Sequence, residues 1–348
     1  MSAERFGAGV LTSAGSTTNV WTEMVRTLAQ SHNKAVFATV SASVLPAGRA
    51  VTRAPKGSAK AAASKAEAIV DGIAGETEYL RPNGSKYFAR KWGVHSDVAA
   101  LRKAREATKQ SVASGMGSPM FALLYGAPGT GKTALVEAAF GNDLYTMLGT
   151  GDTEVADLVG GYVQTASGGF EWVDGDLIRA MEEGKGYFID EIGLIDPKVL
   201  SVLYGAMDGR REVSITANPE RGVVKAHPDF YVVAATNPNA PGVRLSEALL
   251  SRFTVQVEMT TDWALAKKLG APAYLVTAAQ NLAKKLDTGE VSWAPQMREL
   301  LAFRDIESVF GKSFAIQNLL AAAPELDRPV VADVLSRVAG EDCRPARI

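Results

Sequence analysis

Residues 121–133 read Phe-Ala-Leu-Leu-Tyr-Gly-Ala-Pro-Gly-Thr-Gly-Lys-Thr, an apolar run followed by a glycine-rich turn and the beginning of a helical pattern. The turn fits the motif G-x-x-x-x-G-K-[ST] between a strand and a helix, which is typical of a phosphate-binding loop. Its glycines permit backbone angles at which successive N–H groups point inward at one phosphate. We expect that phosphate at the positive end of the following helix.

The loop residues carry the first predicted binding site. We expect them to hold a nucleotide through Gly126, Ala127, Pro128, Gly129, Thr130, Gly131, Lys132 and Thr133. Lys132 should reach the β- and γ-phosphates, and the Thr133 hydroxyl should coordinate Mg²⁺. The alternative is a plain glycine-rich turn, which the flanking strand and helix patterns argue against.

Composition limits the class of protein. The chain has 348 residues, enough for two or three domains, and its 47% hydrophobic and 22% charged residues are ordinary for a soluble globular protein. It contains no apolar run long enough to span a membrane and no secretory signal pattern. One cysteine and three scattered histidines argue against a disulfide framework and a His/Cys metal site. We expect a cytoplasmic protein.

Charge is distributed unevenly along the chain. Residues 1–110 hold 16 Lys and Arg against 8 Asp and Glu. A basic front end could contact nucleic acid or an acidic partner. We favour a solvated linker face, because no aromatic residues are interleaved with the charges at 46–66.

The order of patterns predicts four segments. Residues 1–45 form an N-terminal arm without evident chemistry, and residues 46–80 an Ala/Lys/Pro-rich tether with a short helix. Residues 81–260 should form an α/β nucleotide-binding core, because apolar runs at 144–148, 187–189, 230–235 and 254–257 alternate with helical patterns. This alternation predicts a parallel central sheet flanked by helices. Residues 261–348 read as a small all-α lid.

Two more polar elements follow predicted strands, whose carboxyl ends are where such sheets bind ligands. Asp190 and Glu191 end the predicted strand that begins at Tyr187. Adjacent strand residues point to opposite sides, so the two carboxylates should have different roles. Asp190 would hold Mg²⁺ through its water shell, and Glu191 would polarise the attacking water. Asn237 ends the next strand and would bond both the γ-phosphate and that water; read alone, Asn237-Pro238 is only a turn signal.

Arg252 ends a short helical pattern at 245–253. It is either an ordinary helix-terminal arginine or a finger that enters a neighbouring subunit's site and neutralises charge in the transition state.

These motifs in this order resemble the AAA+ ATPases, and within them the MoxR-like, dynein-related group with an insert in helix 2. The similarity covers roughly residues 87–340. The motifs are Walker A at 126–133, Walker B at 187–191, sensor 1 at 236–238, the arginine finger at 251–253 and sensor 2 at Arg298. In such domains the segment before the first core strand commonly lies near the adenine, which indicates Val94 to Val98. Whether Arg298 serves its own site or its neighbour's stays open.

Two predicted hairpins fit the same group. Tyr162, Phe170 and Trp172 surround a Ser-Gly-Gly turn, which is good hairpin chemistry in its own right. A second strand-turn-strand pattern spans 212–215 and 222–225. In relatives both hairpins project into a central pore; the alternative is a pair of plain surface hairpins.

The resemblance implies a Mg²⁺-dependent ATP hydrolase that forms a homohexameric ring. Hydrolysis would remodel or activate a protein client, with a von Willebrand factor A domain protein as adaptor. A DNA motor of the helicase or translocase type is the alternative, although the expected hairpin tips carry few Lys or Arg. A third hypothesis is a scaffold whose assembly the nucleotide controls.

Overall fold

This computed structural model describes residues 78–340 and 342–345. The predicted arm at 1–45 and nearly all of the tether at 46–80 lie outside these residues. Three residues of the predicted tether are described, and they form strand β1 (Glu78–Leu80), which pairs antiparallel with β2 (Lys86–Phe88). Within this strand Tyr79 packs against the core.

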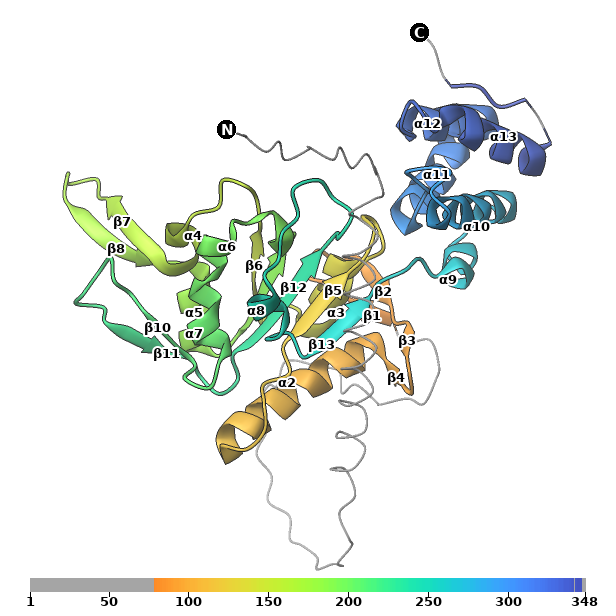
Figure 1. Cartoon of the computed structure of the whole chain (residues 1–348). Coiled ribbons are helices and arrows are strands. Elements are labelled where there is room, and N and C mark those ends of the chain that lie inside the picture. Colours follow the sequence, from red (N-terminus) through yellow and green to blue (C-terminus); the bar gives the residue numbers. More distant parts are fainter. Residues whose placement is uncertain (1–77, 341, 346–348) are drawn as a thin grey trace, which may run out of the picture.

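A five-stranded parallel sheet forms the centre of the molecule, in the order β13-β5-β12-β9-β6 (Figure 1). Its strands are β5 (Ala122–Tyr125), β6 (Leu144–Leu148), β9 (Gly186–Asp190), β12 (Tyr231–Thr236) and β13 (Val255–Glu258). Every residue of β5 and β12 is buried, as expected for inner strands that helices cover on both faces. The predicted α/β fold is thus confirmed.

The helices of the core surround this sheet. They are α2 (Asp97–Ser114), α3 (Lys132–Phe140), α4 (Val155–Val159), α5 (Asp176–Glu183), the 3₁₀ turn η1 (Ile192–Leu194), α6 (Pro197–Leu200), α7 (Val202–Met207) and α8 (Glu247–Leu250). The boundaries of α2 follow from its sequence. The Ser96 hydroxyl accepts a hydrogen bond from the N–H of Ala99 at 3.1 Å, and Gly115 ends the helix at a φ of +63°.

The C-terminal part is helical. It consists of α9 (Trp263–Lys268), α10 (Ala273–Asp287), α11 (Met297–Phe310), α12 (Lys312–Ala322) and α13 (Arg328–Ala339). These helices bury their own hydrophobic cluster, separate from that of the sheet, around Leu275, Leu282, Leu300 and Leu319. None of the helices among the described residues is long and apolar enough to cross a membrane.

Four short strands form two further hairpins at the end of the core opposite the helical part (Figure 1). Strand β7 (Gly160–Gln164) pairs with β8 (Phe170–Asp174), and β10 (Glu212–Ser214) pairs with β11 (Val223–Lys225). Both predicted hairpins are present. A further pair, β3 (Lys91–Trp92) and β4 (His95–Ser96), precedes α2.

Backbone contacts fix the base of the β7-β8 hairpin. A Cβ atom on Gly160 would lie 2.3 Å from the carbonyl oxygen of Val173, and Gly160 has a φ of +118°. Neither the space nor this backbone angle accepts a side chain.

We therefore expect Gly160→Ala to destabilise the core by about 3 kcal/mol, because it adds backbone strain and a clash. Gly161→Ala is the matched control: its new Cβ would meet only the Ala156 side chain at 4.0 Å. Urea unfolding of both variants gives the comparison. Equal free energies of unfolding would contradict this account of the hairpin base.

Candidate nucleotide site

The phosphate loop connects β5 to α3, and its centre touches the helical part of the chain. Gly129 has a φ of +79°, and a Cβ there would lie 2.9 Å from the Cβ of Arg298. The carbonyl of Gly129 also accepts a hydrogen bond from the Arg298 N–H at 3.3 Å. The first turn of α11 therefore lies directly against the loop, which places Arg298 beside the predicted phosphate position.

Lys132 is buried within the loop that it is predicted to serve. Its ammonium donates hydrogen bonds to the carbonyls of Gly126 at 2.9 Å and Ala127 at 3.0 Å. Burial lowers the pKa of Lys132, and the nearby positive charge of Arg298 lowers it further, while Glu191 and Asp190 oppose this shift. A bound phosphate would supply the negative charge that this buried cation lacks.

Thr133 and Asp190 form the polar link between the loop and the sheet. The Thr133 hydroxyl donates a 2.6 Å hydrogen bond to the Asp190 carboxylate. Mg²⁺ in proteins prefers hard oxygen ligands of this kind. The Thr133 hydroxyl would bind the ion directly, and the Asp190 carboxylate would bind it through water. This donor pair fits the predicted metal role, although among the described residues no group of three or more His, Cys, Asp or Glu could hold a metal ion.

Glu191 does not continue the strand, as the sequence pattern suggested. Strand β9 ends at Asp190, and Glu191 has left-handed angles of φ 53° and ψ 40°. Its Oε2 atom is buried without a hydrogen-bond partner. Alternation along a strand therefore cannot separate the roles of the two carboxylates, because Glu191 lies outside the strand. A strained backbone and an orphaned buried carboxylate oxygen mark a candidate functional group.

Asn237 follows β12 directly. The carbonyl of Thr236 accepts a hydrogen bond from the Gly126 N–H at 3.2 Å, so Asn237 begins next to the start of the phosphate loop. Its side-chain oxygen accepts from the N–H of Asn239 at 3.2 Å. The hydroxyl of Thr236 is buried without a partner.

Arg252 has different surroundings. Its guanidinium lies 4.4 Å from the centre of the Tyr204 ring and donates to the carbonyl of Ala248 at 2.5 Å. Across residues 78–340 no hydrogen bond or ion pair connects it to the phosphate loop or to the Asp190-Glu191 pair. The Tyr204 hydroxyl bonds Ser246, whose side chain caps α8. The predicted site residues of the loop, β9 and β12 thus lie at one edge of the sheet, and Arg298 contacts the loop from α11. Arg252 is the exception.

A cavity of about 580 Å³ lies beside Arg90 and Leu135 of α3, within the size range of small-ligand sites. It is lined by Phe88–Trp92 and Val257–Thr260, among others. The expected base-contacting stretch is Val94 to Val98. Val98 is fully buried in the core, so its side chain cannot contact a base, whereas Val94 is 90% exposed. Of that stretch only Asp97 lines the cavity.

Sequence reasoning also missed two residues. Arg90 lines the cavity and bonds the phosphate loop, and Tyr204 holds Arg252. No motif marks either position, because the importance of each residue depends on partners distant in the sequence.

The fold and this site define a phosphate-loop nucleotide-binding protein. Residues 122–253 match the family described as the AAA domain, dynein-related subfamily. Residues 122–253 therefore form an AAA domain of the dynein-related subfamily.

Similar proteins cover only part of the chain. Midasin of Dictyostelium discoideum is 38% identical over 155 residues, which are 42% of this chain and 3% of midasin. An uncharacterised protein of Staphylococcus haemolyticus is 37% identical over 142 residues, 38% of this chain and 53% of its own length. This chain thus matches about half of the staphylococcal protein. A crystal structure from Cytophaga hutchinsonii aligns with 71% of this chain and 88% of its own, at 15% identity and a TM-score of 0.32, too weak a likeness to support a conclusion.

The Glu191 backbone generates a stability prediction. Glu191→Ala removes the unpaired carboxylate but keeps the steric penalty of the left-handed backbone, whereas Glu191→Gly removes both the carboxylate and that penalty. A left-handed non-glycine residue costs about 1–2 kcal/mol. Glycine avoids this cost but loses more backbone entropy on folding, so we expect the glycine variant to be the more stable of the two by about 1 kcal/mol. Urea unfolding without nucleotide measures this. An alanine variant of equal or higher stability would show that the backbone is not strained.

The Thr133-Asp190 link generates a binding prediction. Thr133→Val keeps the side-chain shape but removes the hydroxyl, so the Mg²⁺-dependent part of ATP affinity should fall about tenfold or more, the loss of roughly 1.4 kcal/mol. Thr133→Ser keeps the hydroxyl and should bind like the parent. Calorimetric titration with ATP, with Mg²⁺ or with EDTA, separates the two. Equal MgATP affinity in the valine and serine variants would contradict the metal role.

Proposed function

We propose that this protein is a Mg²⁺-dependent ATP hydrolase of the MoxR-like type that works as a hexameric ring. One observation carries the proposal: Lys132, Thr133, Asp190 and Glu191 belong to one edge of the sheet, while Arg252 lies on Tyr204 without a contact to any of them. An arginine supplied by a neighbouring protomer would complete such a site in the transition state.

Each residue then has a defined task. Lys132 binds the β- and γ-phosphates, and Thr133 and Asp190 hold Mg²⁺, which neutralises charge on the phosphate oxygens. Glu191 takes a proton from the attacking water, and Asn237 orients that water. Arg298 approaches from the lid and Arg252 from the next protomer, so that positive charge surrounds the transferred phosphoryl group.

The hairpins support a protein client over a nucleic acid. Tyr162 and Phe170 of the β7-β8 hairpin are 56% and 70% exposed, and Tyr162 packs edge-on against Trp172. The turn at 165–169 has no cationic residue. The turn of the second hairpin has one, Arg221, which ion-pairs with Asp174 at 3.0 Å and Glu182 at 2.5 Å. Exposed apolar tips suit an unfolded polypeptide, whereas a DNA backbone needs available positive charge.

Hydrolysis should depend on assembly. We expect ATP turnover per protomer to rise with protein concentration, and Arg252→Ala to lower it about 10³-fold while ATP binding persists. Arg337→Ala, which removes an exposed arginine of the lid that ion-pairs with Asp333, is the control. Steady-state phosphate release, together with light scattering for mass, gives both quantities. Full turnover of a dilute monomer would contradict the proposal.

The client class has its own test. A reduced and alkylated, permanently unfolded protein should stimulate turnover in the parent but not in the Tyr162→Ser/Phe170→Ser variant. Val309→Ser/Phe310→Ser, on exposed apolar residues of the lid, serves as the matched control. Stimulation by DNA that weakens steeply with salt, and none by the polypeptide, would favour a nucleic-acid motor instead.

A further inference from the structure

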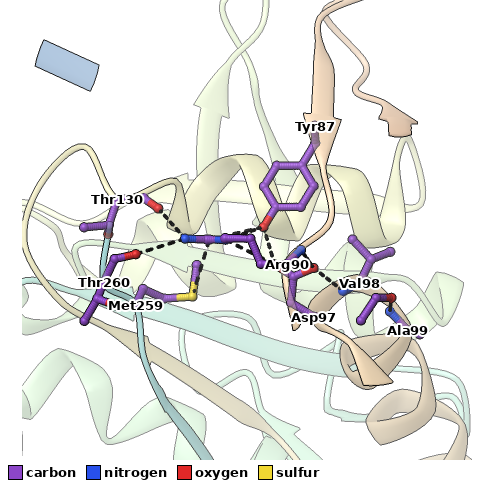
Figure 2. Close-up of polar contacts among 9 residues, drawn as sticks. Tyr87, Arg90, Asp97, Val98, Ala99, Thr130, Met259 and Thr260 are labelled. Carbon is purple, nitrogen blue, oxygen red and sulfur yellow. Dashed lines mark hydrogen bonds and ion pairs between the residues drawn. The ribbon is translucent and has the colours of Figure 1, made fainter. Parts of the chain in front are cut away.

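Arg90 bonds two segments that are far apart in sequence (Figure 2). Its Nη1 donates to the carbonyl of Thr130 in the phosphate loop and to the carbonyl of Thr260, both at 3.1 Å. Thr260 belongs to the stretch between β13 and α9, where the core passes into the lid. One guanidinium nitrogen therefore holds the loop and the core-lid linker together.

The other side of the guanidinium contacts Tyr87 of β2 and Asp97 at the start of α2. Arg90 donates to the Tyr87 hydroxyl from Nε at 3.3 Å and from Nη2 at 3.1 Å, and its Nε lies 3.4 Å from the Asp97 carboxylate. Tyr87 in turn donates to Asp97 (Figure 2). With its side chain only 13% exposed, Arg90 has little freedom to adopt another rotamer.

The surroundings of Tyr87 and Arg90 raise the pKa of both groups, so both stay protonated. Burial raises the pKa of the Tyr87 hydroxyl, which therefore remains a donor to Asp97 at neutral pH. Burial would lower the pKa of Arg90, but the interactions with Tyr87 and Asp97 outweigh burial and raise it. The guanidinium stays charged and its hydrogen bonds stay charge-assisted.

A continuous set of contacts leads from this point into the lid. Thr261 follows Thr260, and its hydroxyl donates to the side chain of Gln296 at 2.7 Å. Gln296 caps α11 and precedes the turn that carries Arg298. The loop residue Gly129 contacts that same turn. Loop, linker and lid thus meet on two sides of the phosphate position.

We propose that Arg90 is a positioning residue that couples the phosphate loop to the core-lid linker, so that nucleotide binding moves the lid. This inference rests on the proposed ATPase function. A bound phosphate that rearranges the loop moves the carbonyl of Thr130. Arg90 bonds this carbonyl with the same nitrogen that bonds Thr260 of the linker, so the movement is passed to the linker. The lid then follows through Thr260 and Gln296.

The test compares two arginines of similar burial. In Arg90→Lys the charge remains, but the shorter side chain ends before the position of Nη1. Arg105→Lys is the matched control: Arg105 has a side chain 17% exposed and also bonds two backbone carbonyls, those of Asp229 and Gly184, away from the loop.

Lid movement is read by energy transfer between dyes at Met116→Cys on the core and Leu326→Cys on the lid, both exposed, with Cys343→Ala and Glu191→Gln in all proteins. A fluorescent ATP analogue gives affinity, and thermal unfolding confirms that each variant is folded. At saturating ATP we expect Arg90→Lys to show less than half of the parent's lid displacement and about tenfold weaker ATP binding, on the scale of a lost charge-assisted hydrogen bond. Arg105→Lys should match the parent in both.

A full lid displacement in Arg90→Lys, or a parent that binds ATP without moving its lid, would overturn the coupling and leave the ATPase proposal intact. A parent that does not bind ATP would overturn the proposed function and this inference with it. If Arg90→Lys unfolds, the variant Tyr87→Phe tests the coupling in its place. This variant keeps the guanidinium and removes the hydroxyl that orients it. It should reduce the displacement to a smaller extent, and an undiminished displacement would reject the coupling.

Discussion

The 2.6 Å hydrogen bond from Thr133 to Asp190 connects the helix that follows β5 to the end of β9, two strands that are not adjacent in the sheet. Thr133 lies in the first turn of α3 after β5, Asp190 ends β9, and β12 lies between these strands. The bond is possible only because parallel strands in register all end at the same edge. Val233 of β12 pairs with Ala122 on one side and Phe188 on the other, and this register sets the separation of loop and carboxylate.

The same edge explains how the lid takes part in the site. The lid has its own hydrophobic cluster, so it is a separate packing unit. It contacts the loop through Arg298 at Gly129 and is connected to it through Arg90 at Thr260. Hinged elements of this kind commonly complete a catalytic site only when ligand is bound. Arg252 lies on the ring of Tyr204. In our proposal it acts at the active site of a neighbouring protomer and not at the site of its own chain.

Sequence predicted well those features that depend on local pattern. The strands at 144–148 and 230–235, the loop and both hairpins could be found because apolar period, glycine placement and turn chemistry are encoded over a few residues. Features without a local sequence signal could not be predicted. Strand β1 was assigned to a tether because its three residues carry no pattern without β2. The left-handed Glu191 is likewise invisible, since glutamate carries no signal for that backbone angle.

The most direct measurement of the central claim, that each active site is shared between protomers, is to mix two inactive variants. Arg252→Ala keeps Glu191, and Glu191→Gln keeps Arg252, so a mixed ring contains interfaces with both residues intact. Random mixing in equal amounts makes about one quarter of the interfaces complete. The account predicts that the mixture regains turnover on that scale, while each variant alone has almost none. A mixture no more active than the mean of its two components would contradict it.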